Sequence, residues 1–389
     1  MNEFKKDLKN AHELKTVGKN RQALKIYEKC YREHPEEFSF NQKNDYAWTI
    51  YRTRIAFFSD EDELFKNVEF VTGLVEQRNF NKCGSCVYTS SIFKVLDHFK
   101  SQNDFASMIP WLKKLDADLL DEKLYRKNGR FNKSHRELYY DWASKAYYQN
   151  MEYERCIEVS KTALNSLKRF IDEGDTWFRW RIAKSLIELG RLSEALEYYE
   201  KVIEVKHDWY MYRDIAEVYL RLEKPWISLD YLCPAVLSNE PNKVKANVYL
   251  TCYRALKSNP EMALKHAQLY SLLRRESGYP LAHEIEQLEI DESQLNKRQL
   301  EKEIRNLWVQ YKYKNRKIQH GTVASFLKEK NYGFIKTEDG DEIFFHKDEF
   351  EGADIFIGQM VSFYTEKSFD RSKNRKSAKA VYIRGDSDV

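Results

Sequence analysis

The sequence predicts a mainly α-helical protein, an array of antiparallel helix pairs that ends in one small β-barrel. Glycine and proline are scarce, at 13 and 7 of 389 residues, and 32% of residues are charged, a composition typical of amphipathic helices. Small and aromatic residues also recur at a period expected of helical hairpins. Near the C-terminus the pattern changes, and aromatic residues recur at every second position, the period of a β-strand.

The helical part is defined by a repeated spacing of small and aromatic residues. In the clearest unit, Gly190 is followed by Ala195 and then by Tyr199. Ala195, Ser228 and Ala263 take the same place in three successive units, 33 and 35 residues apart. Earlier units place comparable residues at Gly18, Ala23, Tyr27 and Cys30, and at Tyr140, Tyr147, Tyr153, Cys156 and Ala163. The spacing resembles the tetratricopeptide repeat, in which small residues let two antiparallel helices touch.

We expect three regions along the chain. Residues 1–280 would form the tetratricopeptide-like solenoid, with irregular helical pairs over 41–138, where no unit spacing is recognisable. Residues 281–318 would form capping helices and a basic linker. Residues 319–385 would form a five-stranded barrel.

Two short stretches of the C-terminal region give the chain its candidate binding surface. Lys330 to Ile335 reads Lys-Asn-Tyr-Gly-Phe-Ile, and Ile343 to His346 reads Ile-Phe-Phe-His. Alternate residues of a strand share a face, so Tyr332 and Phe334 lie together, as do Phe344 and His346. If the strands pair, four flat side chains share one sheet surface, which suits stacking of unpaired bases. Gly333 would leave room for a close approach to the backbone.

These motifs, with Gly321 to Val323, resemble the cold-shock domain, a five-stranded OB-type barrel that binds single-stranded RNA or DNA. The resemblance covers Gln319 to Arg384. It implies stacking roles for Phe326, Tyr332, Phe334, Phe344 and His346, and a basic backbone contact at Lys330. The chain departs from the family in three places: Ser325 replaces a tryptophan, Asn331 a glycine and Lys347 an aromatic residue.

Basic residues gather in three other segments. Arg371, Lys373, Arg375 and Lys376 lie in the expected loop between the fourth and fifth strands, where they would neutralise phosphates. Residues 297–317 combine eight cations with Trp308, Tyr311 and Tyr313, which predicts either an extended nucleic-acid track or a solvated helix with a core tryptophan. For the basic stretch 124–134, a solvated loop between repeats is favoured over a phosphate contact.

No catalytic motif is present. The sequence lacks a phosphate-binding Gly-rich loop, a His-Glu-x-x-His motif and a Gly-x-Ser-x-Gly motif, so we expect neither an enzyme nor a bound cofactor. Cys83 and Cys86 have the spacing of half a zinc site, but no second ligand pair lies near them, so no metal is expected. His135, His207, His266 and His283 stand singly and are expected to be packed or solvated. No membrane span or signal peptide is recognisable, which favours a cytosolic location with cysteines as thiols.

The leading hypothesis is a nucleic-acid-binding adaptor. The barrel would bind single-stranded RNA or DNA by base stacking while the solenoid groove docks a protein partner. A net charge of +4 is small for this length, so attraction to nucleic acid must be local. One alternative is a protein-interaction scaffold whose barrel no longer binds nucleic acid, and another is a metal-dependent nuclease with scattered carboxylates.

Overall fold

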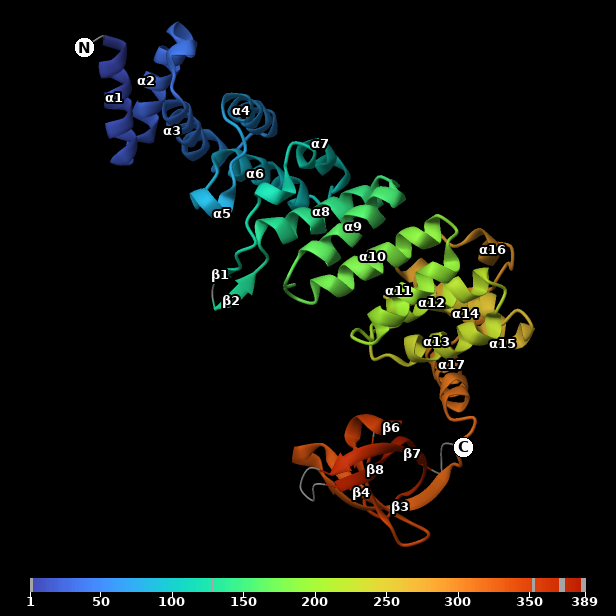
Figure 1. Ribbon diagram of the computed structural model, residues 1–389. Helices are drawn as coiled ribbons and strands as arrows, with labels where there is room; N and C mark the ends of the chain where they lie inside the picture. Colours follow the sequence, from blue (N-terminus) through green and yellow to red (C-terminus); the bar gives the residue numbers. More distant parts are fainter. Residues whose placement is uncertain (1–2, 128, 352–353, 371–374, 386–389) are drawn as a thin grey trace. The chain divides into compact units, whose positions relative to one another are not determined.

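The computed structural model describes residues 3–127, 129–351, 354–370 and 375–385, and confirms helices followed by a C-terminal β-barrel (Figure 1). The chain divides into two compact units, Met1–His207 and Asp208–Val389. The division falls inside the range that the sequence assigned to the solenoid. The second unit therefore holds both helices and the barrel. None of the helices in the described part combines the length and apolarity that crossing a bilayer requires.

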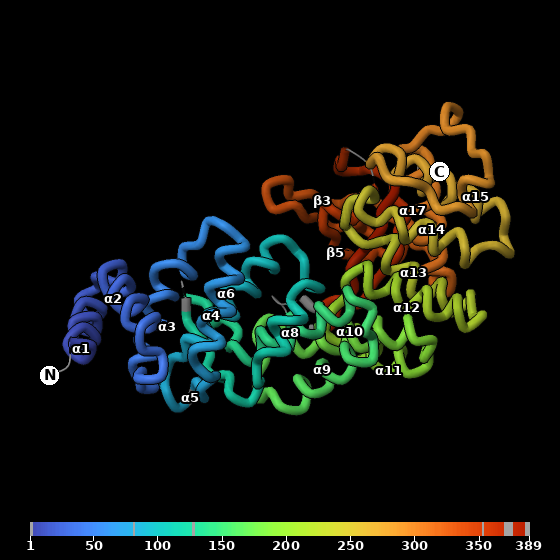
Figure 2. Tube along the Cα trace, turned by 90° about the horizontal axis from the view of Figure 1, so that it is seen from above, coloured from blue at the N-terminus to red at the C-terminus, as the bar shows by residue number. Residues whose placement is uncertain are grey.

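The first unit is helical apart from one short hairpin. Its helices are α1 (Glu3–Thr16), α2 (Asn20–Glu33), α3 (Phe40–Ile50), α4 (Glu61–Leu74), α5 (Phe80–Cys83), α6 (Val87–Ser101), α7 (Ile109–Leu112), α8 (His135–Gln149), α9 (Tyr153–Ser166), α10 (Gly174–Glu188) and α11 (Leu192–Ile203). The hairpin consists of β1 (Tyr125–Lys127) and β2 (Arg130–Asn132), which pair antiparallel. The trace of this unit is drawn from blue to green in Figure 2.

The second unit begins with helices and ends with strands. Its helices are α12 (Trp209–Arg221), α13 (Pro225–Leu237), α14 (Ala246–Ala255), α15 (Pro260–Glu276), α16 (His283–Glu286) and α17 (Lys297–Lys312). Its strands are β3 (Gln319–Leu327), β4 (Tyr332–Thr337), β5 (Glu342–His346), β6 (Phe350–Glu351), β7 (Met360–Asp370) and β8 (Arg375–Gly385).

The predicted repeat units correspond to packed helix pairs. α1 packs on α2, α8 on α9, α10 on α11, α12 on α13 and α14 on α15. In the clearest unit Gly190 ends α10 with a φ of +75°, a left-handed conformation that glycine adopts without strain. Ala195 and Tyr199 are then buried on α11, which lets α10 and α11 approach closely.

Three segments show details that the sequence-based interpretation did not contain. Within the irregular range 41–138, α3 ends at Ile50 and continues as a π-helical turn, Tyr51–Ile55. The basic stretch 124–134 contains the β1–β2 hairpin rather than an irregular loop. In the range 281–318, where capping helices were expected, α16 is a single turn and regular helix resumes only at α17. There Asn296 caps the N-terminus by accepting a hydrogen bond from the Gln299 N–H.

The barrel is one twisted sheet closed on itself. The strand order is β5-β4-β3-β7-β8-β6, and a parallel contact between β5 and β8 closes the ring. Its interior is filled by apolar side chains from all the long strands: Val323, Ile335, Phe345, Val361, Phe363 and Ile383. Because alternate residues point inward, the residues between them form the outer surface on which any ligand of the barrel must bind.

The helices of the second unit enclose a buried histidine. The Nε1–H of Trp308 on α17 donates to Nε2 of His266 on α15 over 2.8 Å, and Nδ1 of His266 lies 2.7 Å from the Met262 carbonyl oxygen. His266 is therefore packed, as the sequence predicted for its lone histidines. Burial lowers the pKa of His266 from 6.5 to about 4, because the charged imidazolium would be shielded from water. Protonation of Nε2 would also remove the acceptor of the hydrogen bond from Trp308.

We expect this histidine to make the second unit acid-labile. Between pH 6.5 and about 4 the unfolded chain binds a proton at His266 that the folded chain does not, so the free energy of unfolding falls as pH falls. The loss should reach about 2–3 kcal/mol at pH 4, and stability should be fully present above pH 6.5. Urea unfolding at several pH values across this range measures the free energy of unfolding. His283→Gln, which replaces an exposed histidine, should show the same pH dependence as the wild type. If His266→Gln shows that pH dependence too, a group other than His266 causes it.

Candidate nucleic-acid interface

The outer face of β4 and β5 carries the predicted ring cluster. Tyr332 pairs with His346, and Phe334 pairs with Phe344, so these four side chains project from the same side of the sheet. The Tyr332 and Phe344 ring centroids are 5.5 Å apart, and the Phe334 and Phe344 centroids 5.9 Å. The three rings are partly exposed and His346 is exposed. The four rings therefore form one open aromatic surface, as the alternation predicted.

Gly333 serves the interior of the barrel rather than a ligand. A Cβ built at this position would lie 2.2 Å from the Ser325 carbonyl oxygen and 2.6 Å from the ring of Phe345. Both distances are far below van der Waals contact, so no side chain fits here. The close approach anticipated from the sequence is real, but the approaching group is the buried Phe345 ring.

Phe326 lies on the other face of the sheet. It pairs with Gly333 and stacks on the Phe345 ring, with centroids 6.1 Å apart and planes at 11°. A β-bulge between Val323 and Ser325 is the cause, because one extra residue reverses which side chains point inward. The structure thus does not bring Phe326 together with the other four predicted stacking residues.

The bulge instead places two unpredicted residues beside the rings. Ser325 pairs with Phe334, and Leu327 pairs with Tyr332, so both belong to the outer face. Leu327 is 47% exposed, so its side chain is available at the edge of the ring cluster. Strict alternation from Val323 would have put Ser325 inside, and no local signal in the sequence marks the bulge.

The basic residues predicted to contact phosphates are placed only in part. Lys330 is exposed directly before β4, next to Asn331, whose φ of +54° explains why glycine or asparagine suits that position. Lys376 is exposed on β8. Arg371 and Lys373 lie outside the described residues, and of Arg375 only the backbone, at the start of β8, is described.

His346 is held in place by its neighbour. Its Nδ1 lies 3.1 Å from a carboxylate oxygen of Asp348, and the backbone N–H of Asp348 is 3.4 Å from the same nitrogen. The imidazole is therefore oriented at the edge of the ring cluster. Asp348 also adds a negative charge beside the ring cluster, so this edge of the face would repel an anionic group.

The aromatic residues of 297–317 contact protein rather than forming an open track. Trp308 and Tyr313 are buried, and the hydroxyl of Tyr311 donates to Asp230 over 2.7 Å. Tyr313 stacks on Tyr364 of β7, with ring centroids 4.4 Å apart and planes at 14°. Of the two interpretations that the sequence left open, these contacts favour the packed one.

The same segment attaches the barrel to the helices of the second unit. The Tyr313 hydroxyl donates to Glu366 over 2.7 Å, and Lys312 pairs with the same carboxylate oxygen at 2.9 Å. Arg316 donates to the Thr365 carbonyl oxygen over 2.6 Å. Burial alone would raise the pKa of Glu366, but the hydrogen bonds from Lys312 and Tyr313 hold it below its ordinary value.

A second bulge, in β8, completes this attachment. Tyr382 has a φ of +50°, a left-handed conformation that costs a residue with a Cβ roughly 1–2 kcal/mol. In return Tyr382 turns toward α17, where its ring meets Tyr313 at 5.5 Å and the Arg305 guanidinium at 5.3 Å. The preceding Val381 packs into the helical core rather than into the barrel interior. These contacts fix β7 and β8, which leaves the ring cluster on β4 and β5 outside the attachment.

No metal site accompanies these surfaces. Within residues 3–127, 129–351, 354–370 and 375–385, no group of three or more His, Cys, Asp or Glu side chains could hold an ion. Cys83 ends α5 and its thiol contacts the Asn79 and Ser85 carbonyl oxygens, while Cys86 is buried at the start of α6.

Two sequence families match the chain. The model of the "'Cold-shock' DNA-binding domain" matches residues 319–383, the span of the barrel. The model described as "Domain of unknown function (DUF7017)" matches residues 176–316. No curated protein sequence gives a significant match to this chain.

Solved structures with a similar helical trace are distant in sequence. The human IFIT1 dimer with PPP-AAAA is 11% identical, with a TM-score of 0.36; the match covers 76% of this chain and 60% of the IFIT1 chain. A tetratricopeptide repeat protein from Parabacteroides merdae is 12% identical, with a TM-score of 0.33 and 79% and 98% coverage. The TPR2AB domain of yeast Sti1 in its pHSP90 complex is 14% identical, with a TM-score of 0.28 and 65% and 98% coverage.

At such low TM-scores these structures support no statement about function. The helix pairs of the chain itself and the match at its C-terminus decide its classification. The chain is a tetratricopeptide-like helical array whose C-terminal segment belongs to the cold-shock domain family, as the sequence predicted.

Proposed function

We propose that the chain is a non-enzymatic adaptor that binds single-stranded RNA or DNA on its barrel and a protein partner on its helix pairs. One observation carries the first half of this proposal: four rings lie together, open to solvent, on the face of a cold-shock domain. Each base stacked on such a ring contributes roughly 1–3 kcal/mol whatever its identity, so recognition is weakly sequence-selective.

The strand would lie across β4 and β5. Tyr332, Phe334, Phe344 and His346 supply the stacking surfaces, with Leu327 as an apolar border beside Tyr332. Lys330 and Lys376 would pair with phosphates, helped by Arg371, Lys373 and Arg375 of the same β7–β8 segment. Polar residues at Ser325 and Lys347 replace aromatic positions of the family, so we expect a shorter stacked stretch than in its fully aromatic members.

The helix pairs would supply the protein contact. This half rests on the resemblance of the repeat units to tetratricopeptide repeats, and it is an analogy of fold rather than an argument from a site. Titrating the full chain with labelled RNA and DNA of the same mixed sequence, and following fluorescence polarisation, tests the first half. No binding of either strand at low salt would favour the scaffold alternative.

Salt dependence should identify the phosphate contacts. Binding of a single strand should weaken as salt rises, with a slope in log K against log salt of about 0.7 per neutralised phosphate. Replacing Lys330 and Lys376 together by alanine is expected to lower that slope by about 1.4. Lys161 and Lys168, exposed lysines of the first unit, provide a matched double variant. Equal slopes for both double variants would show that Lys330 and Lys376 do not contact phosphates.

A further inference from the structure

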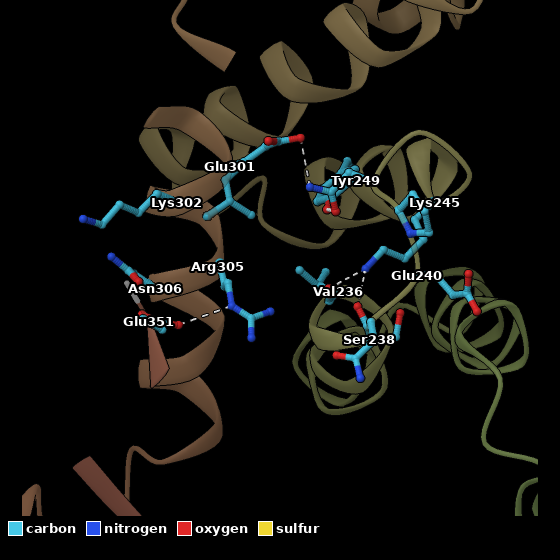
Figure 3. Close-up of a pocket in the computed structure, with 14 residues that line it drawn as sticks. Val236, Ser238, Glu240, Lys245, Tyr249, Glu301, Lys302, Arg305, Asn306 and Glu351 are labelled. Carbon is cyan, nitrogen blue, oxygen red and sulfur yellow. Dashed lines mark hydrogen bonds and ion pairs between the residues drawn. The ribbon is translucent and has the colours of Figure 1, made fainter. Parts of the chain in front are cut away.

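A cavity of about 630 Å³ lies in the second unit, away from the ring cluster. Its walls come from the connection between α13 and α14, from α17 and from Glu351 of β6 (Figure 3). Cavities of this volume are typical of small-molecule sites. None of the residues proposed to bind a nucleic-acid strand lines it. The cavity is therefore a second candidate site with its own chemistry.

Lys245 places a buried positive charge in the cavity wall. The residue is 1% exposed, and its Nζ donates to the carbonyl oxygens of Val236 and Ser238, each over 2.8 Å. These carbonyls end α13, where the backbone carries partial negative charge, so the lysine acts as a C-terminal cap. Two neutral acceptors satisfy only two of the three ammonium donors, and no carboxylate pairs with the charge among its described contacts.

A second cation faces the same space. Figure 3 shows the Arg305 guanidinium directed from α17 into the gap that Lys245 borders. Burial, together with the positive charge of Arg305, lowers the pKa of Lys245 to about 8. Lys302, one turn earlier on α17, is exposed, and Figure 3 shows its side chain directed away from Lys245 and Arg305. Two cations that repel each other across a cavity create a position where an anion gains from both.

The carboxylates of the cavity are occupied or lie to one side. Glu351 pairs with both Arg305, at 3.3 Å, and Arg384, at 2.9 Å, so it cannot neutralise either fully. Glu301 accepts a hydrogen bond from Asn242 over 3.0 Å. Glu240 is exposed. The lining thus contains both cations and carboxylates.

We propose that this cavity binds a phosphate monoester of mononucleotide size, with the phosphate between Lys245 and Arg305. The Glu301 carboxylate, which has a second oxygen beside the one bonded to Asn242, would accept from a hydroxyl or amino group of such a ligand. A ligand with an anionic end and a donor-rich end fits a lining in which cations and carboxylates are both present. The proposal is independent of strand binding by the barrel.

Isothermal titration of the full chain with AMP, GMP, CMP and UMP tests it. At least one monophosphate should bind with a Kd below about 1 mM, and the matching nucleoside, which lacks the phosphate, should bind at least about tenfold more weakly. Equal binding of nucleotide and nucleoside, or no binding of any of the four, overturns the proposal. The ring variant Tyr332→Ala with Phe334→Ala should bind the monophosphate like the wild type; loss of that binding assigns it to the ring face instead.

Substitutions of the cations test the phosphate position. Arg305→Gln removes the second cation that faces the cavity and should weaken monophosphate binding at least about tenfold. Its unfolding curve shows whether losing the contacts with Glu351 and Tyr382 affects folding. Lys243→Gln alters an exposed lysine of the α13–α14 connection that does not line the cavity, and should bind like the wild type. If the two variants bind alike, Arg305 takes no part. Lys245→Met should abolish binding, and its unfolding curve reports whether the uncapped α13 still folds.

The wild-type protein offers a test without substitutions. A bound phosphate favours the charged form of Lys245, so binding near pH 8 should take up protons, and affinity should fall as pH rises from 7 to 9. The phosphate is a dianion throughout this range. The other charged residues that line the cavity are Glu240 of the α13–α14 connection, Glu301, Lys302 and Arg305 of α17, and Glu351 of β6. Heats that do not change with buffer ionisation enthalpy would exclude Lys245 as the phosphate contact.

Discussion

Replacing Tyr332 and Phe334 together by alanine is expected to weaken binding of a single strand by about 2–6 kcal/mol, from thirtyfold to more than ten-thousandfold. The two rings are adjacent outward positions of β4, 6.1 Å apart, and each offers a face to one base. The loss should be the same for strands of different sequence, because stacking does not read base edges. Fluorescence polarisation with mixed-sequence RNA and DNA measures it.

The double variant should leave the barrel folded. Both rings point away from the interior, which is filled by Phe345 and its neighbours, so their removal opens no internal cavity. Thermal unfolding of variant and wild type checks this. Trp226→Ala removes an aromatic side chain that is 62% exposed on α13 and should bind the strand like the wild type. If the ring variant also binds like the wild type, the proposed face is not the binding surface.

The ring cluster could be predicted because it depends on a local rule. Side chains alternate along a strand, so Tyr332 and Phe334 share a face in any structure in which those residues form a strand. Pairing of β4 with β5 then needed only a short turn between them, and Gly340, with a φ of +89°, supplies it. The helix pairs were predicted for the same reason, since Gly190 and Ala195 act within one unit.

The position of Phe326 could not be predicted from alternation. A bulge adds one residue between Val323 and Ser325, and every side chain after it changes face. The bulge is set by pairing with β4 and by the fit of Phe345 against Gly333, which are contacts across the barrel. Leu327 was overlooked for the same reason, and its exposure follows directly from the bulge.

The attachment of the barrel depends on contacts between residues far apart in sequence. Tyr313 meets Tyr364 and Glu366, some fifty residues later, and a basic aromatic segment shows no sign of which partner it will find. The cavity near Lys245 likewise joins α13, α17 and β6. Both the attachment and the cavity depend on which distant residues pack together, and the residues near each position in the sequence do not determine this.

The attachment leads to the second large expected effect. Tyr313 is 1% exposed, stacks on Tyr364, touches Tyr382 and donates to Glu366. Tyr313→Ala removes the ring from this packed site and leaves Glu366 with one donor fewer. We expect the free energy of unfolding of the second unit to fall by about 3–5 kcal/mol, the usual cost of deleting a buried aromatic side chain.

Tyr313→Phe separates the ring from the hydroxyl. This variant keeps the stack on Tyr364 but loses the hydrogen bond to Glu366, so the loss should be only about 1–2 kcal/mol. In this variant Lys312 still pairs with the Glu366 carboxylate, so its negative charge keeps a partner. Urea unfolding followed by tryptophan fluorescence measures both variants, because Trp308 lies on the same helix. If Tyr313→Ala lowers the free energy of unfolding no more than Tyr313→Phe does, the stack on Tyr364 does not hold the barrel to α17. If both variants unfold like the wild type, the barrel and the helices are stabilised separately. The strained backbone at Tyr382 would then have to be stabilised by contacts other than those with Tyr313.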